Sequence, residues 1–130
     1  MKFHTMLLLG SFLSIITVTN SALALDCRNP QSQTAMNQCA SVELEYETKK
    51  INKTYNDYRA NLDPAHRQQL KEVQLAWIKF KDLACEFDAS GSEGGSVHSM
   101  VLANCLTEKT RQRNKELETL ANCQEGDVSC

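Results

Sequence analysis

The most reactive side chains of this 130-residue chain are its six cysteines: Cys27, Cys39, Cys85, Cys105, Cys123 and Cys130. A cysteine acts as a nucleophile or a metal ligand only as a free thiolate. Disulfides, by contrast, are the usual state of several cysteines in a small exported domain. We therefore interpret all six as halves of structural disulfides. Six cysteines allow many pairings, and the sequence leaves the choice among them open.

The export signal is the N-terminal leader, residues 1–24. An apolar stretch covers residues 6–18, and Ala22 and Ala24 fit the small-residue pattern of a secretory cleavage site. Serines and a threonine interrupt the stretch, which is also shorter than a membrane span, so cleavage is favoured over anchoring. Because Asp26 precedes Cys27 where a lipoprotein carries a small residue, we expect a soluble periplasmic or secreted protein beginning at Leu25.

Enzymatic chemistry has little support in the remaining chain. His66 and His98 are its only histidines, and neither lies in a catalytic or metal-binding signature. With 16 acidic residues, a pair of carboxylates at hydrolase spacing occurs by chance. Removal of Lys2 with the leader takes the formal net charge from −2 to −3, which disfavours nucleic acid as a partner. The chain is therefore predicted to be no enzyme and to need no metal or cofactor.

A glycine-rich segment at residues 88–96 is the other candidate site. A phosphate-binding loop needs a lysine and a hydroxyl after its glycines, and Ser96 and Val97 stand there instead. A calcium loop needs oxygen ligands at fixed positions, which are also missing. We interpret the segment as a turn between two helices, with positive φ angles at glycines and Ser96 as the cap of the following helix.

Three helical segments frame this turn, at residues 34–62, 64–88 and 96–122. Asp63 followed by Pro64 predicts the start of the second helix. Apolar residues at spacings of three and four predict one buried stripe on each helix. The first stripe is Leu44, Thr48, Ile51, Tyr55, Tyr58 and Leu62, and the second is Leu70, Val73, Trp77, Phe80, Ala84 and Phe87. The third is Val97, Val101, Cys105 or Leu106, Thr110, Arg113, Leu117 and Leu120, and its polar end predicts partial exposure.

The predicted fold is an all-α antiparallel bundle of about three long helices, held by disulfides. No window alternates apolar and polar residues over the length of a strand, and the short connections favour antiparallel neighbours. Residues 25–122 form one helical domain, followed by a short tail at 123–130 that contains two cysteines. Glu43 and Glu47 are expected on a solvated face of the first helix, where Glu45 precedes Lys49 by four residues.

The chain resembles the LprI-type lysozyme inhibitor family across nearly its whole length beyond the leader. The second half carries this likeness at residues 76–82 (AWIKFKD), 85–87 (CEF), 93–96 (EGGS) and 105–107 (CLT), and at Arg111. The first half agrees at residues 26–27 (DC), 34–40 (TAMNQCA) and 52–55 (NKTY). The resemblance implies an α-helical exported bacterial domain. It also implies one disulfide within the early cysteine pair, another within the pair that flanks the Gly-Gly-Ser loop, and inhibition of lysozyme by some members.

A lysozyme cleft contains two carboxylates, so an inserted loop would need hydrogen-bond donors. The glycine-rich turn offers serine hydroxyls, an imidazole and the amides of Gly94 and Gly95, with Glu93 placed to contact a basic rim. The predicted partner-binding residues are Ser90, Ser92, Glu93, Gly94, Gly95, Ser96 and His98. The alternative is a periplasmic module, such as an immunity, adaptor or envelope-stress protein, that binds another exported protein without inhibiting lysozyme.

Overall fold

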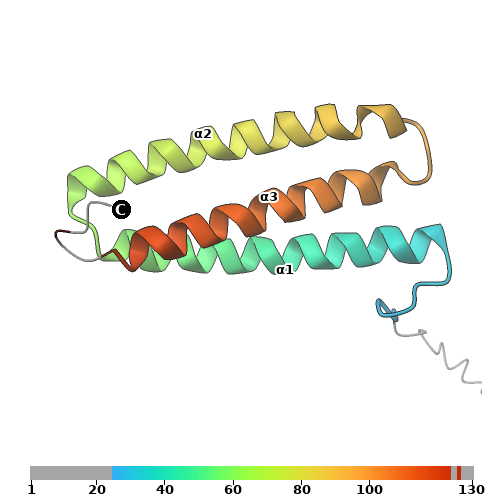
Figure 1. Ribbon diagram of the computed structural model, residues 1–130, viewed down its shortest axis with the longest axis horizontal. Helices are drawn as coiled ribbons and strands as arrows, with labels where there is room; N and C mark the ends of the chain where they lie inside the picture. Colours follow the sequence, from blue (N-terminus) through green and yellow to red (C-terminus); the bar gives the residue numbers. More distant parts are fainter. Residues whose placement is uncertain (1–24, 124–125, 127–130) are drawn as a thin grey trace, which may run out of the picture.

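Three long helices make up most of the computed structural model, which describes residues 25–123 and residue 126 (Figure 1). They are α1 (Gln33–Ala60), α2 (Pro64–Ala89) and α3 (His98–Ala121), with a short 3-10 helix, η1 (Ser90–Ser92), after α2. The described residues contain no strand. The all-α antiparallel bundle is thus confirmed, and the predicted leader and Cys130 lie outside the described residues.

The first two helices begin at side-chain caps. Ser32 Oγ accepts a hydrogen bond from the Ala35 amide at 3.1 Å, and Asp63 Oδ1 accepts from the amides of Ala65 and His66 at 2.9 and 3.2 Å. Pro64 then occupies the first helical position of α2, where its missing N–H costs nothing. The predicted start of the second helix is therefore confirmed.

The predicted cap of α3 by Ser96 is wrong. The residue at the cap position is Val97, and no side chain there accepts a hydrogen bond from the helix. The turn itself supplies the acceptor, because the His98 amide donates to the Gly95 carbonyl at 3.2 Å. Ser96 is fixed differently: its carbonyl accepts from Asn37 Nδ2 of α1 at 2.9 Å. That bond ties the turn between α2 and α3 to the start of α1.

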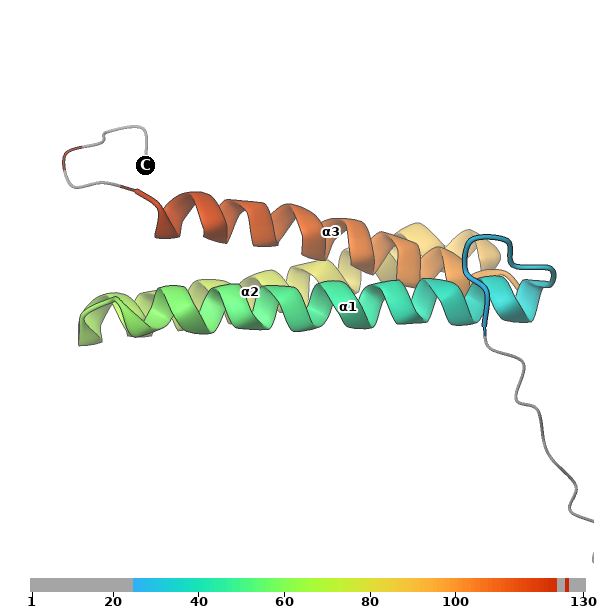
Figure 2. The same ribbon diagram turned by 90° about the horizontal axis from the view of Figure 1, so that it is seen from below.

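Helix α3 lies between the other two helices and contacts both of them, whereas α1 and α2 contact each other little. The view from below shows α1 running beside α3 for most of its length (Figure 2). Each helix is about 36–42 Å long at 1.5 Å per residue, so the bundle is elongated. The start of α1 and the turn between α2 and α3 lie at the same end (Figure 1); we call this the tip end.

The apolar core is small and lies toward the opposite end. Its buried members are Ile51, Leu70 and Leu117, one from each helix. Tyr55, Tyr58, Leu62 and Trp77 pack against them. These residues belong to the predicted stripes, so the sequence located this end of the core correctly. Thr48 was expected in the same stripe and is exposed.

The predicted core positions Val73, Phe80 and Phe87 are wrong, because all three side chains are exposed. Helix α2 packs mainly on α3. The face of α2 that contacts α3 carries Leu70, Gln74 and Cys85. The more apolar face of α2 therefore points away from its neighbour.

The expected exposure of the last half of α3 is also wrong. Asn114 and Leu117 are completely buried there, because α3 is the central helix and is covered from two sides. Arg113 is buried as well, and its Nε donates to Gln74 Oε1 of α2 at 3.2 Å. The polar end of the predicted stripe thus forms contacts between helices and does not face solvent.

A guanidinium joins α1 to α3. Arg111 donates to Glu43 at 2.8 Å and to Glu47 at 3.1 Å, both on α1, and to Glu108 on its own helix at 3.0 Å. The hydrogen bond that Arg111 donates to Glu47 is the largest cause that raises the pKa of Arg111. Glu47 is buried, so the expected solvated face is wrong at this residue, while the expected pair of Glu45 with Lys49 is confirmed at 2.6 Å.

Two disulfides have the pairing that the family resemblance implied. Cys27 is bonded to Cys39, and Cys85 is bonded to Cys105. The first ties the segment before α1 to that helix, and the second ties the end of α2 to α3. Cys123 is also disulfide-bonded. Two of the predicted structural disulfides are therefore confirmed with their partners.

Replacing Cys85 and Cys105 together with alanine is expected to lower the free energy of unfolding by about 3 kcal/mol from loop entropy alone. The measured loss should exceed that figure, because Cys85 is completely buried and helps to hold α2 on α3. Denaturant unfolding followed by circular dichroism measures it. The control removes Cys27 and Cys39, whose loop has nearly the same entropy but fixes no helix on another. Equal losses in the two variants would contradict this account of α2.

The cap of α2 predicts a dependence of stability on pH. The hydrogen bond with the His66 side chain, followed by that with the His66 amide, lowers the pKa of Asp63 from its ordinary value of 3.8. A carboxyl group with a lowered pKa stabilises the folded state above its unfolded pKa, and that contribution is lost as the pH falls through the folded pKa. Asp63→Asn keeps a good cap without the charge. The wild type should be more stable than D63N at neutral pH, and the difference in unfolding free energy should disappear below pH 3.8; a difference that persists in acid would contradict the linkage.

Candidate functional site

The seven residues predicted to bind a partner all lie at the tip end, between the last turn of α2 and the first turn of α3. We call residues 90–98 the tip loop. The Cys85–Cys105 disulfide bridges the two helices at its base, with a Cα separation of 5.6 Å. The loop is therefore presented at the end of a braced pair of helices.

Hydroxyl groups of the tip loop are used mainly to shape the loop itself. Ser90 Oγ donates to the Phe87 carbonyl at 2.7 Å, and Ser92 Oγ donates to the Ala89 carbonyl at 2.8 Å. Ser92 Oγ also lies 3.2 Å from His98 Nδ1. These contacts continue the end of α2 into η1 and fix the imidazole against the loop.

The two glycines of the tip loop have different tasks. Gly94 has a φ of +75°, a conformation that glycine adopts without strain. A Cβ on Gly95 would stand 3.1 Å from the Ser92 carbonyl oxygen, so alanine there forces the loop to shift. The Gly95 amide already donates to that same carbonyl at 3.0 Å. The expectation of a free amide at Gly95 is therefore wrong, although Gly95 is exposed, as are Ser90, Glu93, Gly94 and Ser96.

A cavity of about 290 Å³ brings part of the predicted set together. Ser90, Glu93 and His98 line it, and so do Glu86 from α2 and Leu102 from α3. The sequence analysis missed the last two residues. A signal for them existed, because Glu86 precedes Ser90 by four residues and Leu102 follows His98 by four, which places each on the same helix face.

The tip end carries negative charge. Between Lys81 and Lys109 the chain has no lysine or arginine and five acidic residues: Asp82, Glu86, Asp88, Glu93 and Glu108. Asp82 pairs with Lys81 and Glu108 pairs with Arg111, which leaves the charges of Glu86, Asp88 and Glu93 nearest the tip. The cations of α2 and α3 lie outside this segment, toward the other half of the molecule. A surface of this kind attracts cationic partners.

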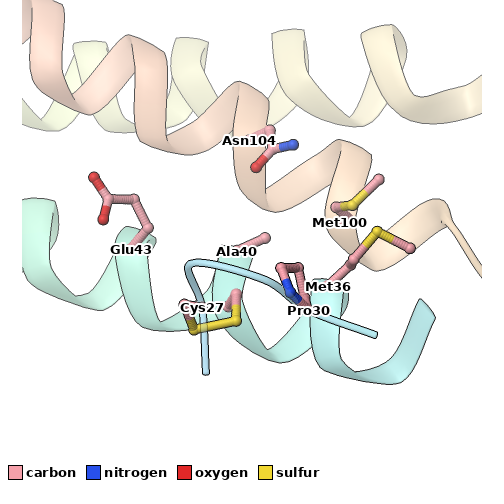
Figure 3. Close-up of a pocket in the computed structure, with 8 residues that line it drawn as sticks. Cys27, Pro30, Met36, Ala40, Glu43, Met100 and Asn104 are labelled. Carbon is pink, nitrogen blue, oxygen red and sulfur yellow. A yellow bond between two sulfur atoms is a disulfide. The ribbon is translucent and has the colours of Figure 1, made fainter. Parts of the chain in front are cut away.

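A second cavity of about 320 Å³ lies at the same end, between the start of α1 and α3 (Figure 3). Met36 and Ala40 of α1 face Met100 and Asn104 of α3 across it, and the Cys27–Cys39 disulfide and Pro30 form its outer side. Its lining mixes thioether, amide and carboxylate groups without a nucleophile. Among residues 25–123, no group of His, Cys, Asp and Glu side chains is arranged to hold a metal ion.

Within the same described part of the chain, no helix has the length and apolar character that a membrane span requires. The structural disulfides fit an extracytoplasmic location, where thiols are oxidised.

Comparison with known proteins supports the likeness noted in the sequence. The family model described as Lysozyme inhibitor LprI matches residues 27–117. An uncharacterized protein of Rhizobium meliloti (strain 1021) is 34% identical over 108 residues, with 73% of this chain and 78% of that protein covered. No solved structure matches the chain. The matched span begins at Cys27 and includes both described disulfides and the tip loop. The chain therefore belongs to the LprI lysozyme inhibitor family.

Proposed function

We propose that this protein is an exported inhibitor of lysozyme that binds the enzyme through the tip loop. Membership of the LprI family supports the inhibitory activity. The observation that carries the choice of surface is the acidic, disulfide-braced tip end, where Glu86, Asp88 and Glu93 lie in a segment without lysine or arginine.

Charge favours this end of the molecule. Lysozymes of animal type are strongly basic, so acidic groups at the tip accelerate the encounter and orient it. The basic half of the inhibitor does not cancel this effect, because the helices are about 36–42 Å long and charges are screened over about 8 Å at physiological ionic strength. The enzyme therefore meets the local charge of the tip.

The polar groups of the tip loop match the chemistry of a lysozyme cleft. The cleft carries two carboxylates, which accept hydrogen bonds from an inserted segment. The Gly94 amide, the Ser96 hydroxyl and the His98 ring are donors for them, while Glu93 contacts the basic rim. Because the loop is already fixed by Ser90, Ser92 and the disulfide at its base, little conformational entropy is lost on binding.

The proposed cellular setting follows from the leader. Cleavage before Leu25 delivers the domain of residues 25–122 and the tail at 123–130 to the periplasm or the medium, where the disulfides form. The proposed action is occlusion and not catalysis, because Ser92 Oγ, the hydroxyl beside the His98 ring, donates its proton to the Ala89 carbonyl and not to the imidazole. A 1:1 complex with the enzyme is the expected product.

Titration against lysozyme in a cell-wall turbidity assay tests the proposal. The wild type should inhibit the enzyme, and Glu93→Lys should raise the half-inhibitory concentration by about threefold to tenfold, because an exposed ion pair is worth up to about 1 kcal/mol and is here replaced by repulsion. The matched control is Asp57→Lys, which changes the net charge equally near the end of α1 far from the tip. Inhibition by D57K should equal that of the wild type.

Equal inhibition by E93K and the wild type would remove the tip loop from the interface while leaving the activity intact. Failure of the wild type against several lysozyme types would overturn the activity itself. In that case a pull-down from periplasmic extract should identify the partner of a non-inhibitory interaction module.

A further inference from the structure

Helix α2 exposes a continuous apolar row, which we call the α2 stripe: Val73, Ala76, Phe80, Leu83 and Phe87. The four large side chains are 53%, 63%, 56% and 79% exposed, in chain order. Their spacings of three and four residues place them on one side of the helix, next to the face that carries Leu70, Gln74 and Cys85, and Phe80 lines a small cavity with Lys109 of α3 at the edge of the stripe. Single exposed apolar residues are normal, but a contiguous row marks an interaction surface.

The stripe has the spacing of a coiled-coil seam. Val73, Phe80 and Phe87 are seven residues apart, and Ala76 and Leu83 fill the alternate positions, which is the pattern by which two helices pack side by side. Within the described part of the chain, Lys109 of α3 approaches the Phe80 ring to 5.6 Å from its centre, and the ring stays mostly exposed. The surface is therefore shaped for another helix.

We propose that a second copy of this chain covers the α2 stripe, with the two α2 helices antiparallel about a two-fold axis between Phe80 and Leu83. In that register Phe80 packs on the partner's Leu83, and Phe87 packs on the partner's Ala76, so a large side chain meets a smaller one in each layer. Two-fold symmetry repeats each contact, as in most homodimers.

Two charges beside the stripe select this register. Lys79 and Glu86 are exposed, flank the stripe on one side, and form no ion pair with the rest of the described chain. In the antiparallel pair, Lys79 lies beside the partner's Glu86, and Glu86 lies beside the partner's Lys79. A shift of the register by one heptad places Lys79 beside the partner's Lys79 and Glu72 beside the partner's Glu86. Both contacts bring like charges together and are repulsive. A parallel pair leaves both charges without partners.

The proposal is independent of lysozyme inhibition. In this register the two tip loops point in opposite directions, and Val73 of each copy lies level with the partner's Ser90, at the base of the partner's tip loop. The stripe carries both signs of charge in a self-complementary order, whereas a strongly basic enzyme fits the acidic tip better. These features favour a second copy over a foreign protein as the occupant.

Sedimentation equilibrium of the oxidised protein across the micromolar range tests the dimer. The wild type should sediment as a dimer, and Leu83→Lys should raise the dimer dissociation constant at least about tenfold, because it places two lysines at the axis. Leu75→Lys is the matched control: Leu75 is 56% exposed, as Leu83 is, but it lines the groove between α1 and α2. L75K should dimerise like the wild type, and circular dichroism confirms that both variants fold.

Charge reversal tests the register. Lys79→Glu and Glu86→Lys should each weaken the dimer by about threefold, and the double variant K79E/E86K should recover wild-type association, because it restores both ion pairs in the opposite sense. A monomeric wild type, equal effects of L83K and L75K, or no recovery in the double variant would overturn the proposal. So would a monomeric wild type whose lysozyme inhibition is lost in L83K, since the stripe would then contact the foreign partner.

Discussion

The disulfide between Cys85 and Cys105 is the constraint on which this structure depends. Helix α2 turns its most apolar face to solvent, so apolar burial alone holds it weakly on α3. The small core at Leu70 fixes one end of α2, and the disulfide fixes the other. With both ends fixed, the turn that joins α2 to α3 is closed into a rigid loop. The same bond therefore explains why an exposed face is tolerated on α2 and why the tip loop keeps one shape.

Polar contacts, rather than a broad apolar core, align the central helix. Arg111 reaches two carboxylates of α1, and Arg113 reaches Gln74 of α2, so α3 is connected to both neighbours through guanidinium groups. Buried ion pairs add little net stability, because desolvation offsets much of the attraction. Their geometry is directional, however, and a slip of one helix along another would leave Glu47 buried without its partner. These contacts are thus better suited to fixing the register of the bundle than to increasing its stability.

The sequence predicted the helices and much of the tip but not which face of α2 is buried. Asp63 and Pro64 marked the start of α2 because capping is a local effect. The face was misjudged because α2 has two apolar rows, and the larger side chains at Phe80 and Phe87 made the exposed row look like core. Which face of a helix is buried in a bundle depends on its neighbours. In α2, the Cys85–Cys105 disulfide turns the face of Cys85 toward α3. The tip residues were proposed from their chemistry, and their role in binding stays a prediction. Glu86 and Leu102 share a helix face with two of them, but the fold is needed to bring them to one cavity. The Gly95 amide is consumed by a turn whose hydrogen bonds the sequence spacing does not reveal.

The exposed row and the acidic tip divide the outside of the molecule into two independent surfaces. In the proposed function the tip acts through charge and hydrogen-bond donors, which suit a foreign, basic partner and respond to salt. The α2 stripe acts through apolar packing, which responds little to salt and repeats on a symmetric copy. Dimerisation as proposed would bury the stripe and so stabilise α2. The proposed dimer thereby explains why Phe80 and Phe87 are exposed in a single chain: the second chain buries them. Their burial would also stabilise the end of α2 that leads into the tip loop, on the side away from the Cys85–Cys105 disulfide.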